Sequence, residues 1–180
     1  MRILIYSPAF YPSIGGLETQ IYLLAFNFVA LNHEVKVITK VPDPQFKIFP
    51  FEIIRNPSPL RLLKEISWCN IYFQANISLK GLWPLLFVKK PWGVTHQGWY
   101  CRSDGHLGWQ DYIKNYVVRF AYSVSASEAI AKNIPSHSIV IPNTYGITYS
   151  LISLESPLEK MYNCCNHNKP NGIGKIVCSG

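Results

Sequence analysis

The chain alternates between short apolar runs and longer stretches in which apolar residues recur at helical spacing. Residues 2–6 form the first short run, and bounded runs of this kind are typical of strands buried in a parallel sheet. In residues 17–31, leucine, isoleucine and phenylalanine return at steps of four and three, which predicts a helix with one apolar stripe. The same order of strand and helix patterns repeats as far as residue 143.

The later segments predict the rest of the fold. Further strands are predicted at residues 34–39, 49–55, 70–75, 92–95, 122–125 and 138–143. Further helices are predicted at residues 60–68, 79–88, 109–122 and 128–134, with a proline interrupting the second of them. Strands that alternate with helices predict an α/β fold. We expect a Rossmann-like, open and mostly parallel sheet of about seven strands with helices on both faces.

The pattern changes after residue 143. Residues 144–174 have no sustained period and carry serine, asparagine, proline and glycine, which is typical of a linker. Residues 175–180 again have the pattern of a buried strand, but a strand with nothing after it cannot cover both of its faces. We therefore expect a Rossmann-like domain at 1–143, a linker at 144–174 and the first strand of a second domain at 175–180, as in a fragment or a truncated protein.

The turn after the first predicted strand holds Gly15 and Gly16. Glycine has no Cβ, so its backbone can take a positive φ and a ligand can approach it closely. A helix that begins at Leu17 would direct its free N–H groups and the positive end of its dipole toward an anion there. This predicts a phosphate cradle, although such a glycine pair is also common as a plain turn. Glu18 has a structural explanation too, because a carboxylate in the first turn complements the dipole.

A second polar stretch begins at His96 and Gln97, directly after the strand predicted at 92–95. Open α/β sheets place their ligands at the carboxyl ends of the strands. A neutral His96 imidazole would hydrogen-bond a sugar hydroxyl, and a protonated one would bind a phosphate. A histidine that only caps the end of a strand is an equally open interpretation.

The net charge and the motifs limit the classes of partner that this chain is expected to bind. The chain has 17 Lys and Arg against 10 Asp and Glu, a formal net charge of +7, which favours nucleotide phosphates, an anionic membrane surface or nucleic acid. We rank nucleic acid last and expect none, because no nucleic-acid module signature is present. The dinucleotide fingerprint G-x-G-x-x-G and the P-loop motif are also absent. Aromatic residues near Trp83, Trp92 and Trp99 are expected to be exposed and favour a membrane surface as a partner.

The number and spacing of the cysteines indicate the cellular compartment of the protein and whether it binds a metal. The cysteines are Cys69, Cys101, Cys164, Cys165 and Cys178. An odd count without a regular framework or a secretion signal indicates the cytoplasm, with a peripheral position at the cytoplasmic membrane face as a variant. The close group of Cys164, Cys165 and His167 lacks a second ligand pair at zinc spacing, so we expect no metal. No apolar stretch reaches the ~20 residues that a membrane span needs.

Several short motifs, in order along nearly the whole chain, resemble a known enzyme family. They are Pro12-x-x-Gly15-Gly16-x-Glu18, Asn32-His33-Glu34-Val35-x-Val37-x-Thr39, Thr95-His96 after Lys90-Pro91, Ser125-x-Ser127 with Ile134, Val140-Ile141-Pro142-Asn143 and Lys175-Ile176-Val177-Cys178-Ser179-Gly180. This set resembles the N-terminal domain of family 4 glycosyltransferases, which have the GT-B fold. The last motif resembles the first strand of their C-terminal domain. The family usually has glycine where this chain has Asn32.

The resemblance implies retaining transfer of a sugar from a nucleotide-sugar to a glycan or a lipid-linked acceptor. It implies that Gly15 and Gly16 approach the donor diphosphate and that His96, the candidate catalytic residue, lies near the transferred sugar. Glu18, Gln97 and Asn143 complete the candidate substrate-binding set. No cofactor or metal is expected besides the nucleotide-sugar. In the family, most of the nucleotide site lies in the C-terminal domain, so we expect the 180-residue chain alone to be inactive.

Two alternatives stay open from the sequence. The alternative to the first interpretation is a non-catalytic binding module, or one subunit of a two-chain glycosyltransferase in which a partner supplies the missing domain. A Rossmann-like domain of unrelated function is weakened by the absent dinucleotide motif. The donor sugar, the acceptor and the pathway are not identified by these residues.

Overall fold

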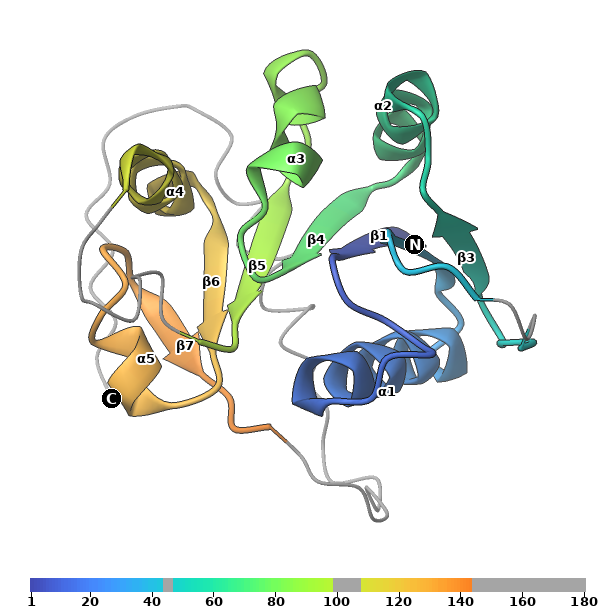
Figure 1. Cartoon of the computed structure of the whole chain (residues 1–180), viewed down its shortest axis with the longest axis horizontal. Helices are drawn as coiled ribbons and strands as arrows, with labels where there is room; N and C mark the ends of the chain where they lie inside the picture. The colour runs from blue at the N-terminus through green and yellow to red at the C-terminus, as the bar shows by residue number, and fades with distance from the viewer. Residues whose placement is uncertain (44–46, 99–107, 144–180) are drawn as a thin grey trace. The chain divides into compact units, whose positions relative to one another are not determined.

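The computed structural model describes residues 1–43, 47–98 and 108–143, all in the first of two compact units of the chain (Figure 1). Seven strands form one sheet in the order β3-β2-β1-β4-β5-β6-β7, and every neighbouring pair is parallel. The strands are β1 (Arg2–Ser7), β2 (Glu34–Thr39), β3 (Glu52–Arg55), β4 (Ile71–Ala75), β5 (Trp92–His96), β6 (Tyr122–Ser125) and β7 (Ser138–Val140). The predicted fold class is confirmed.

The helices lie between the strands, as the alternating pattern predicts. They are α1 (Gly16–Ala30), α2 (Pro59–Trp68), α3 (Leu79–Leu82), α4 (Trp109–Val117) and α5 (Glu128–Ala131), with the 3₁₀ helices η1 (Trp83–Leu86) and η2 (Val118–Phe120). Figure 1 shows α1 on one side of the sheet and α2 and α3 on the other. Proline at the start of η1 divides the segment predicted as one interrupted helix.

Strand β1 lies at the centre of the sheet, between β2 and β4. Ile3 pairs with Val35 of β2 on one side and with Ile71 of β4 on the other, and its side chain is fully buried. The chain runs outward from β1 to β3 and then returns to β4 on the opposite side of β1. The order of the strands therefore reverses between β1 and β4, which is where open α/β sheets bind ligands.

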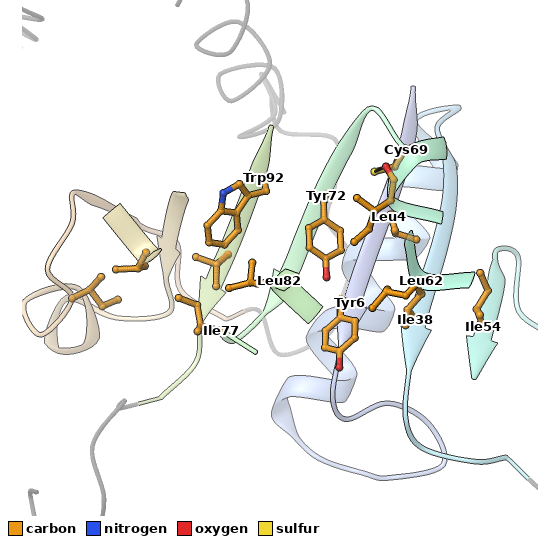
Figure 2. Packing of buried hydrophobic residues seen from close by; sticks show 14 residues of the cluster. Leu4, Tyr6, Ile38, Ile54, Leu62, Cys69, Tyr72, Ile77, Leu82 and Trp92 are labelled. Carbon is orange, nitrogen blue, oxygen red and sulfur yellow. Dashed lines mark hydrogen bonds between the residues drawn. The ribbon is translucent and has the colours of Figure 1, made fainter. Parts of the chain in front are cut away.

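Each face of the sheet has its own apolar layer. On one face, α1 buries Ile21, Ala25 and Phe28, which belong to or adjoin the predicted stripe. The other face carries a continuous core between the strands and the remaining helices (Figure 2). This core includes Leu4, Tyr6, Ile38, Ile54, Leu62, Ile66, Tyr72, Leu82, Trp92, Val94, Val118 and Ile134.

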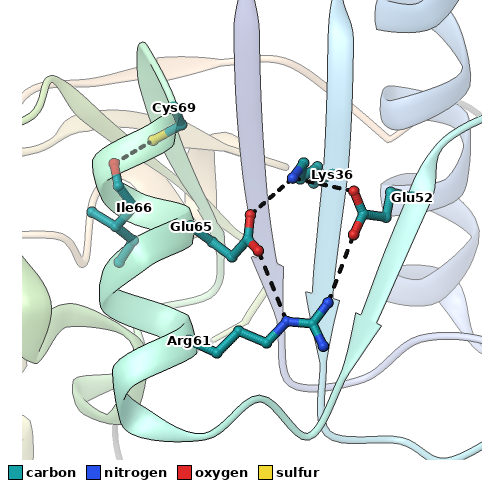
Figure 3. A network of polar contacts seen from close by, with 6 residues as sticks. All are labelled: Lys36, Glu52, Arg61, Glu65, Ile66 and Cys69. Atoms are coloured by element: carbon teal, nitrogen blue, oxygen red, sulfur yellow. Dashed lines mark hydrogen bonds and ion pairs between the residues drawn. The ribbon is translucent and has the colours of Figure 1, made fainter.

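Helix α2 is also held on the sheet by charged side chains (Figure 3). Lys36 of β2 places its Nζ 3.0 Å from a carboxylate oxygen of Glu65 on α2 and 3.2 Å from Glu52 of β3. Arg61 of α2 lies 3.8 Å from both carboxylates and completes the network. The Lys36 ammonium also lies 4.2 Å from the centre of the Trp68 ring, a cation–π contact.

Several predicted elements are longer than the observed ones. The helix predicted at 109–122 ends at residue 117 and is followed by η2. Strand β3 begins at Glu52 rather than at Phe49, because Pro50 has no N–H for the ladder. The Phe49 ring packs instead against the rings of Phe10 and Phe51, each with a centroid distance of 5.6 Å. Helix α5 ends at residue 131 and β7 ends at residue 140, just before another proline. The predicted linker at 144–174 and strand at 175–180 lie outside the described residues.

Candidate functional site

The candidate residues from the sequence lie at or after the carboxyl ends of strands. Gly15, Gly16 and Glu18 come after β1, Gln97 comes directly after β5, and Asn143 follows β7. His96 is the last residue of β5. Since all strands are parallel, these ends lie along one edge of the sheet, the edge at which this class of fold binds ligands.

Gly15 and Gly16 form the start of α1, in backbone conformations that do not require glycine. Gly15 is the N-cap with φ of −176°, which is extended backbone that any residue adopts, and Gly16 does not have a positive φ either. Neither residue therefore uses the positive φ that glycine permits. What the glycines provide is space, because a Cβ built on Gly16 would meet no atom within 4 Å.

Glu18 lies over the turn that the glycines form. A Cβ on Gly15 would come within 2.5 Å of Glu18 Oε2, so the carboxylate rests against this glycine at the positive end of the helix. The carboxylate thus occupies the place where the predicted phosphate cradle would hold its anion. A phosphate that binds at Gly15 has to displace the Glu18 side chain, whereas the space beside Gly16 is open.

Gln97 and Asn143 meet, although 46 residues separate them in the sequence. The Asn143 side-chain amide donates a hydrogen bond to Gln97 Oε1. Gln97 in turn donates from Nε2 to Thr95 Oγ1 at 2.9 Å and from its backbone N–H to Asn76 Oδ1 at 2.8 Å. This polar cluster (Asn76, Thr95, Gln97 and Asn143) joins the ends of β4, β5 and β7.

Asn76 is the member of the cluster that sequence reasoning missed. It directly follows β4 and has a φ of 58°, a left-handed conformation that asparagine tolerates better than most residues. Its backbone N–H donates to the carbonyl of Thr95 at 2.9 Å while its side chain accepts from Gln97. An asparagine at the end of a buried strand was the available signal.

His96 is fully buried, with no exposed surface. Strand alternation places its side chain on the same face as Val94 and Trp92. Burial lowers the pKa of the imidazole to about 4, because a charged ring would lose its hydration. The ring is therefore neutral at pH 7, which favours hydrogen bonding over ionic binding of a phosphate. The sugar contact that the family resemblance implies stays a prediction, and it requires the ring to become accessible.

Cysteine chemistry and metal binding find no support in the described part of the chain. Burial raises the pKa of Cys69 to about 11, so this thiol is protonated at neutral pH and is a poor nucleophile. The described residues contain no group of three or more histidine, cysteine or acidic side chains that could hold a metal ion. Cys101, Cys164, Cys165, His167 and Cys178 lie outside them.

Exposed aromatic side chains gather mainly on α4 and η2, although Phe87, next to Trp83, is also 73% exposed. Trp92 is only 8% exposed and belongs to the core, so that part of the expectation is wrong. Trp83 is half-buried against Phe87, and Trp99 is not among the described residues. On α4 and η2 the exposed residues are Trp109, Tyr112, Tyr116 and Phe120, at 62–69%.

The orientation of α4 is the reverse of an ordinary surface helix. Its exposed aromatic residues recur at steps of three and four and so share one face. Asp111 and Lys114, by contrast, form an ion pair at 3.0 Å with only 14% and 23% of their side chains exposed. None of the described helices is both long enough and apolar enough to cross a membrane.

Neither a protein-family model nor a curated protein matches this sequence. Among solved structures, an alpha-glucosyltransferase in complex with UDP and a 13-mer DNA matches with 16% identity and a TM-score of 0.49, over 77% of this chain and 40% of its own. A ugt transferase from Siraitia grosvenorii in complex with UDP matches with 10% identity and a TM-score of 0.42, over 90% of this chain and 54% of its own. A Granulicella formate dehydrogenase matches with 11% identity and a TM-score of 0.38, over 94% of this chain and 45% of its own. This chain thus spans 40–54% of the length of these structures, and likeness at this level does not select a reaction.

Proposed function

We propose that this chain is the acceptor-side half of a retaining glycosyltransferase that uses a nucleotide-sugar donor. The observation that carries the proposal is the hydrogen bond between Gln97 and Asn143. Gln97 follows the Thr95-His96 motif and Asn143 ends the Val-Ile-Pro-Asn motif, and both motifs resemble those of family 4 glycosyltransferases. Their meeting at the carboxyl edge of a parallel sheet is what a shared substrate site requires.

The described residues suit distinct parts of this reaction. The open space beside Gly16 and the positive end of α1 would receive the donor diphosphate. The amide groups of Gln97 and Asn143 offer donors and acceptors of the kind that bind sugar hydroxyls. Neutral His96 would hydrogen-bond the transferred sugar once it is uncovered. None of these roles needs a metal or a further cofactor.

Departure of a nucleoside diphosphate needs positive charge on its oxygens. We propose that a C-terminal domain or a partner subunit supplies this charge, and that the 180-residue chain alone does not turn over. Under the alternative, a non-catalytic binding module, the diphosphate would still bind but adding the donor domain would not produce transfer. An assay of sugar transfer by the chain joined to a donor domain distinguishes the transferase half from the binding module. We place either form in the cytoplasm, where a reduced Cys69 is expected to persist.

Diphosphate binding is the first test of the proposal. UDP and GDP are titrated into the ¹⁵N-labelled chain, with uridine as a ligand that lacks phosphate. Gly16→Val should abolish the diphosphate response, because its side chain would occupy the open space in which a Cβ on Gly16 meets no atom within 4 Å. Ala30→Val, an exposed change of similar kind at the other end of α1, is the control. Unchanged diphosphate affinity in Gly16→Val would refute the cradle.

We also propose that the enzyme meets an anionic membrane surface through the exposed face of α4 and η2. Tryptophan and tyrosine are enriched at membrane interfaces, and the exposed Arg119 and the net charge of +7 favour anionic lipid. Wild type should sediment with phosphatidylglycerol vesicles at low salt, and Trp109→Ser/Tyr116→Ser should not. Tyr22→Ser, on α1, is the matched control. Equal sedimentation of all three proteins would refute this surface, and so would absence of binding.

A further inference from the structure

A groove of about 360 Å³ opens at the carboxyl edge, and its lining includes residues of α2 and α3, the helices that Figure 1 shows on the side of the sheet opposite α1. Its lining includes Tyr6, Lys40, Asn56, Leu62, Lys80 and Trp83. Tyr6 comes from β1, Lys40 directly follows β2, and Lys80 lies on α3, which follows β4. The groove therefore borders the place between β1 and β4 where the strand order reverses, the favoured ligand position in this class of fold.

The groove is positively charged. Both Lys40 and Lys80 are exposed, and neither takes part in an ion pair among the described residues. None of the described residues that line the groove is an aspartate or a glutamate. Burial raises the pKa of the Tyr6 hydroxyl, which therefore stays neutral at physiological pH and adds no negative charge. Two uncompensated ammonium groups at the mouth of one groove attract an anion.

The rest of the lining is apolar and includes an aromatic ring. Leu62 is buried at the base, and Trp83 is half-buried with its ring packed edge-on against Phe87. An indole that is fixed in this way offers a rigid surface to the apolar face of a sugar ring. The combination of two lysines with this surface fits a ligand that carries its negative charge next to a sugar ring.

A buried polar network fixes the segment that carries Lys80 and Trp83. Gln74 accepts a hydrogen bond from the backbone N–H of Ser78 at 2.9 Å and donates to the Tyr72 hydroxyl at 3.0 Å. Tyr72 in turn donates to the carbonyl of Gly81 at 2.8 Å. The start of α3 is thus tied to β4, and the groove wall is set by the core rather than by a surface loop.

From these observations we infer that the groove binds the acceptor through a phosphate group that adjoins a sugar ring. The inference rests on the proposed transferase function and adds to it the chemical class of the acceptor. The acceptor and the donor diphosphate would then bind on opposite sides of the end of β1, the acceptor beside Tyr6 and the donor beside the first turn of α1.

Glucose 1-phosphate is the probe, with glucose as the neutral comparison. Its titration into the ¹⁵N-labelled chain should shift the indole N–H of Trp83. Lys40→Gln and Lys80→Gln should each weaken its binding about five-fold, which is the scale of one exposed charge contact. Lys64→Gln, an exposed lysine of α2 outside the groove, should leave binding unchanged. Binding that does not respond to either groove lysine, or no binding at all, overturns the inference.

The same variants separate this inference from the proposed function. UDP binding should survive Lys40→Gln and Lys80→Gln and be lost in Gly16→Val, whereas glucose 1-phosphate should show the reverse. If the wild-type chain does not bind UDP but binds glucose 1-phosphate through the groove lysines, the cradle is refuted and the groove stays assigned. Neutral phosphatidylcholine vesicles that carry a polyprenyl phosphate-linked glucose, presented to the same chains, distinguish the source of the phosphate. Binding to vesicles that needs the groove lysines identifies a lipid-linked acceptor, and binding of soluble sugar phosphate alone identifies a free one.

Discussion

Gly81→Ala should destabilise the protein although it exchanges glycine for a better helix former. A Cβ on Gly81 would lie 2.6 Å from Gln74 Nε2, 2.9 Å from Tyr6 Cδ1 and 2.9 Å from the Tyr72 hydroxyl oxygen. All three neighbours are at most 2% exposed, and Gln74 and Tyr72 are held by hydrogen bonds, so none can move away without breaking a contact. Glycine is required here by close packing.

The size of the effect follows from opposing contributions. Overpacking of a core costs about 1–3 kcal/mol, and a lost buried hydrogen bond adds about 1 kcal/mol. The helix propensity of alanine offsets about 1 kcal/mol of this. We expect the free energy of unfolding to fall by about 2 kcal/mol, with a drop in Tm of about 4–8 °C for a chain of this length.

Gly16→Ala provides the matched control, because the same chemical change at the first residue of α1 meets no atom within 4 Å. Urea denaturation of both variants, followed by tryptophan fluorescence and circular dichroism, gives the two free energies. Gly16→Ala should be neutral or slightly stabilising. If the two variants agree to within about 0.5 kcal/mol, the packing argument is refuted. A displaced α3 should also weaken glucose 1-phosphate binding, because it carries Lys80.

Three further predictions test other parts of the molecule. Lys36→Met should cost about 2 kcal/mol in urea denaturation, because Glu65 loses its nearest cation, while the exposed Lys64→Met should cost little. The pKa of His96 is lower in the folded protein than in the unfolded chain. Its contribution to the free energy of unfolding is therefore complete above pH 6.5 and is lost as the pH falls toward 4. Wild type should therefore lose about 3 kcal/mol more stability than His96→Gln between pH 7 and pH 4, and parallel losses would contradict the shifted pKa. Glu18→Gln should raise UDP affinity about three- to five-fold by removing a competing carboxylate, whereas weaker binding would make Glu18 a substrate ligand.

Much of the fold could be predicted because the buried strands are short, apolar and regularly separated by helical patterns. Strand β2 has the predicted bounds, and α1 and α2 begin within one residue of theirs. The errors arise where a local pattern continues past the end of the ladder. Phe49 is apolar because it belongs to a ring cluster, not because it pairs with β2, and no periodicity distinguishes these two reasons.

The candidate site was predictable only in part. Gln97 was identified from the polar stretch after a predicted strand and Asn143 from a motif, but their hydrogen bond depends on the sheet order, which no local pattern contains. The groove was missed because its lysines follow different strands and have no common motif. The aromatic face of α4 was recognised as helical, yet periodicity does not say whether an apolar face points inward. Here the ion pair of Asp111 and Lys114 turns toward the protein instead.

The end of β1 explains how two different ligands could be bound so close together. Consecutive residues of a strand point to opposite faces of a sheet. Tyr6 therefore faces the groove between α2 and α3, while Ser7 faces the side on which α1 lies and leads into the loop that ends at Gly15. One strand thus separates the proposed acceptor and donor positions. The two positions share no side chain, so a variant should abolish binding of one ligand without affecting binding of the other. A single substitution that abolishes binding of both ligands would show that the two positions are one site.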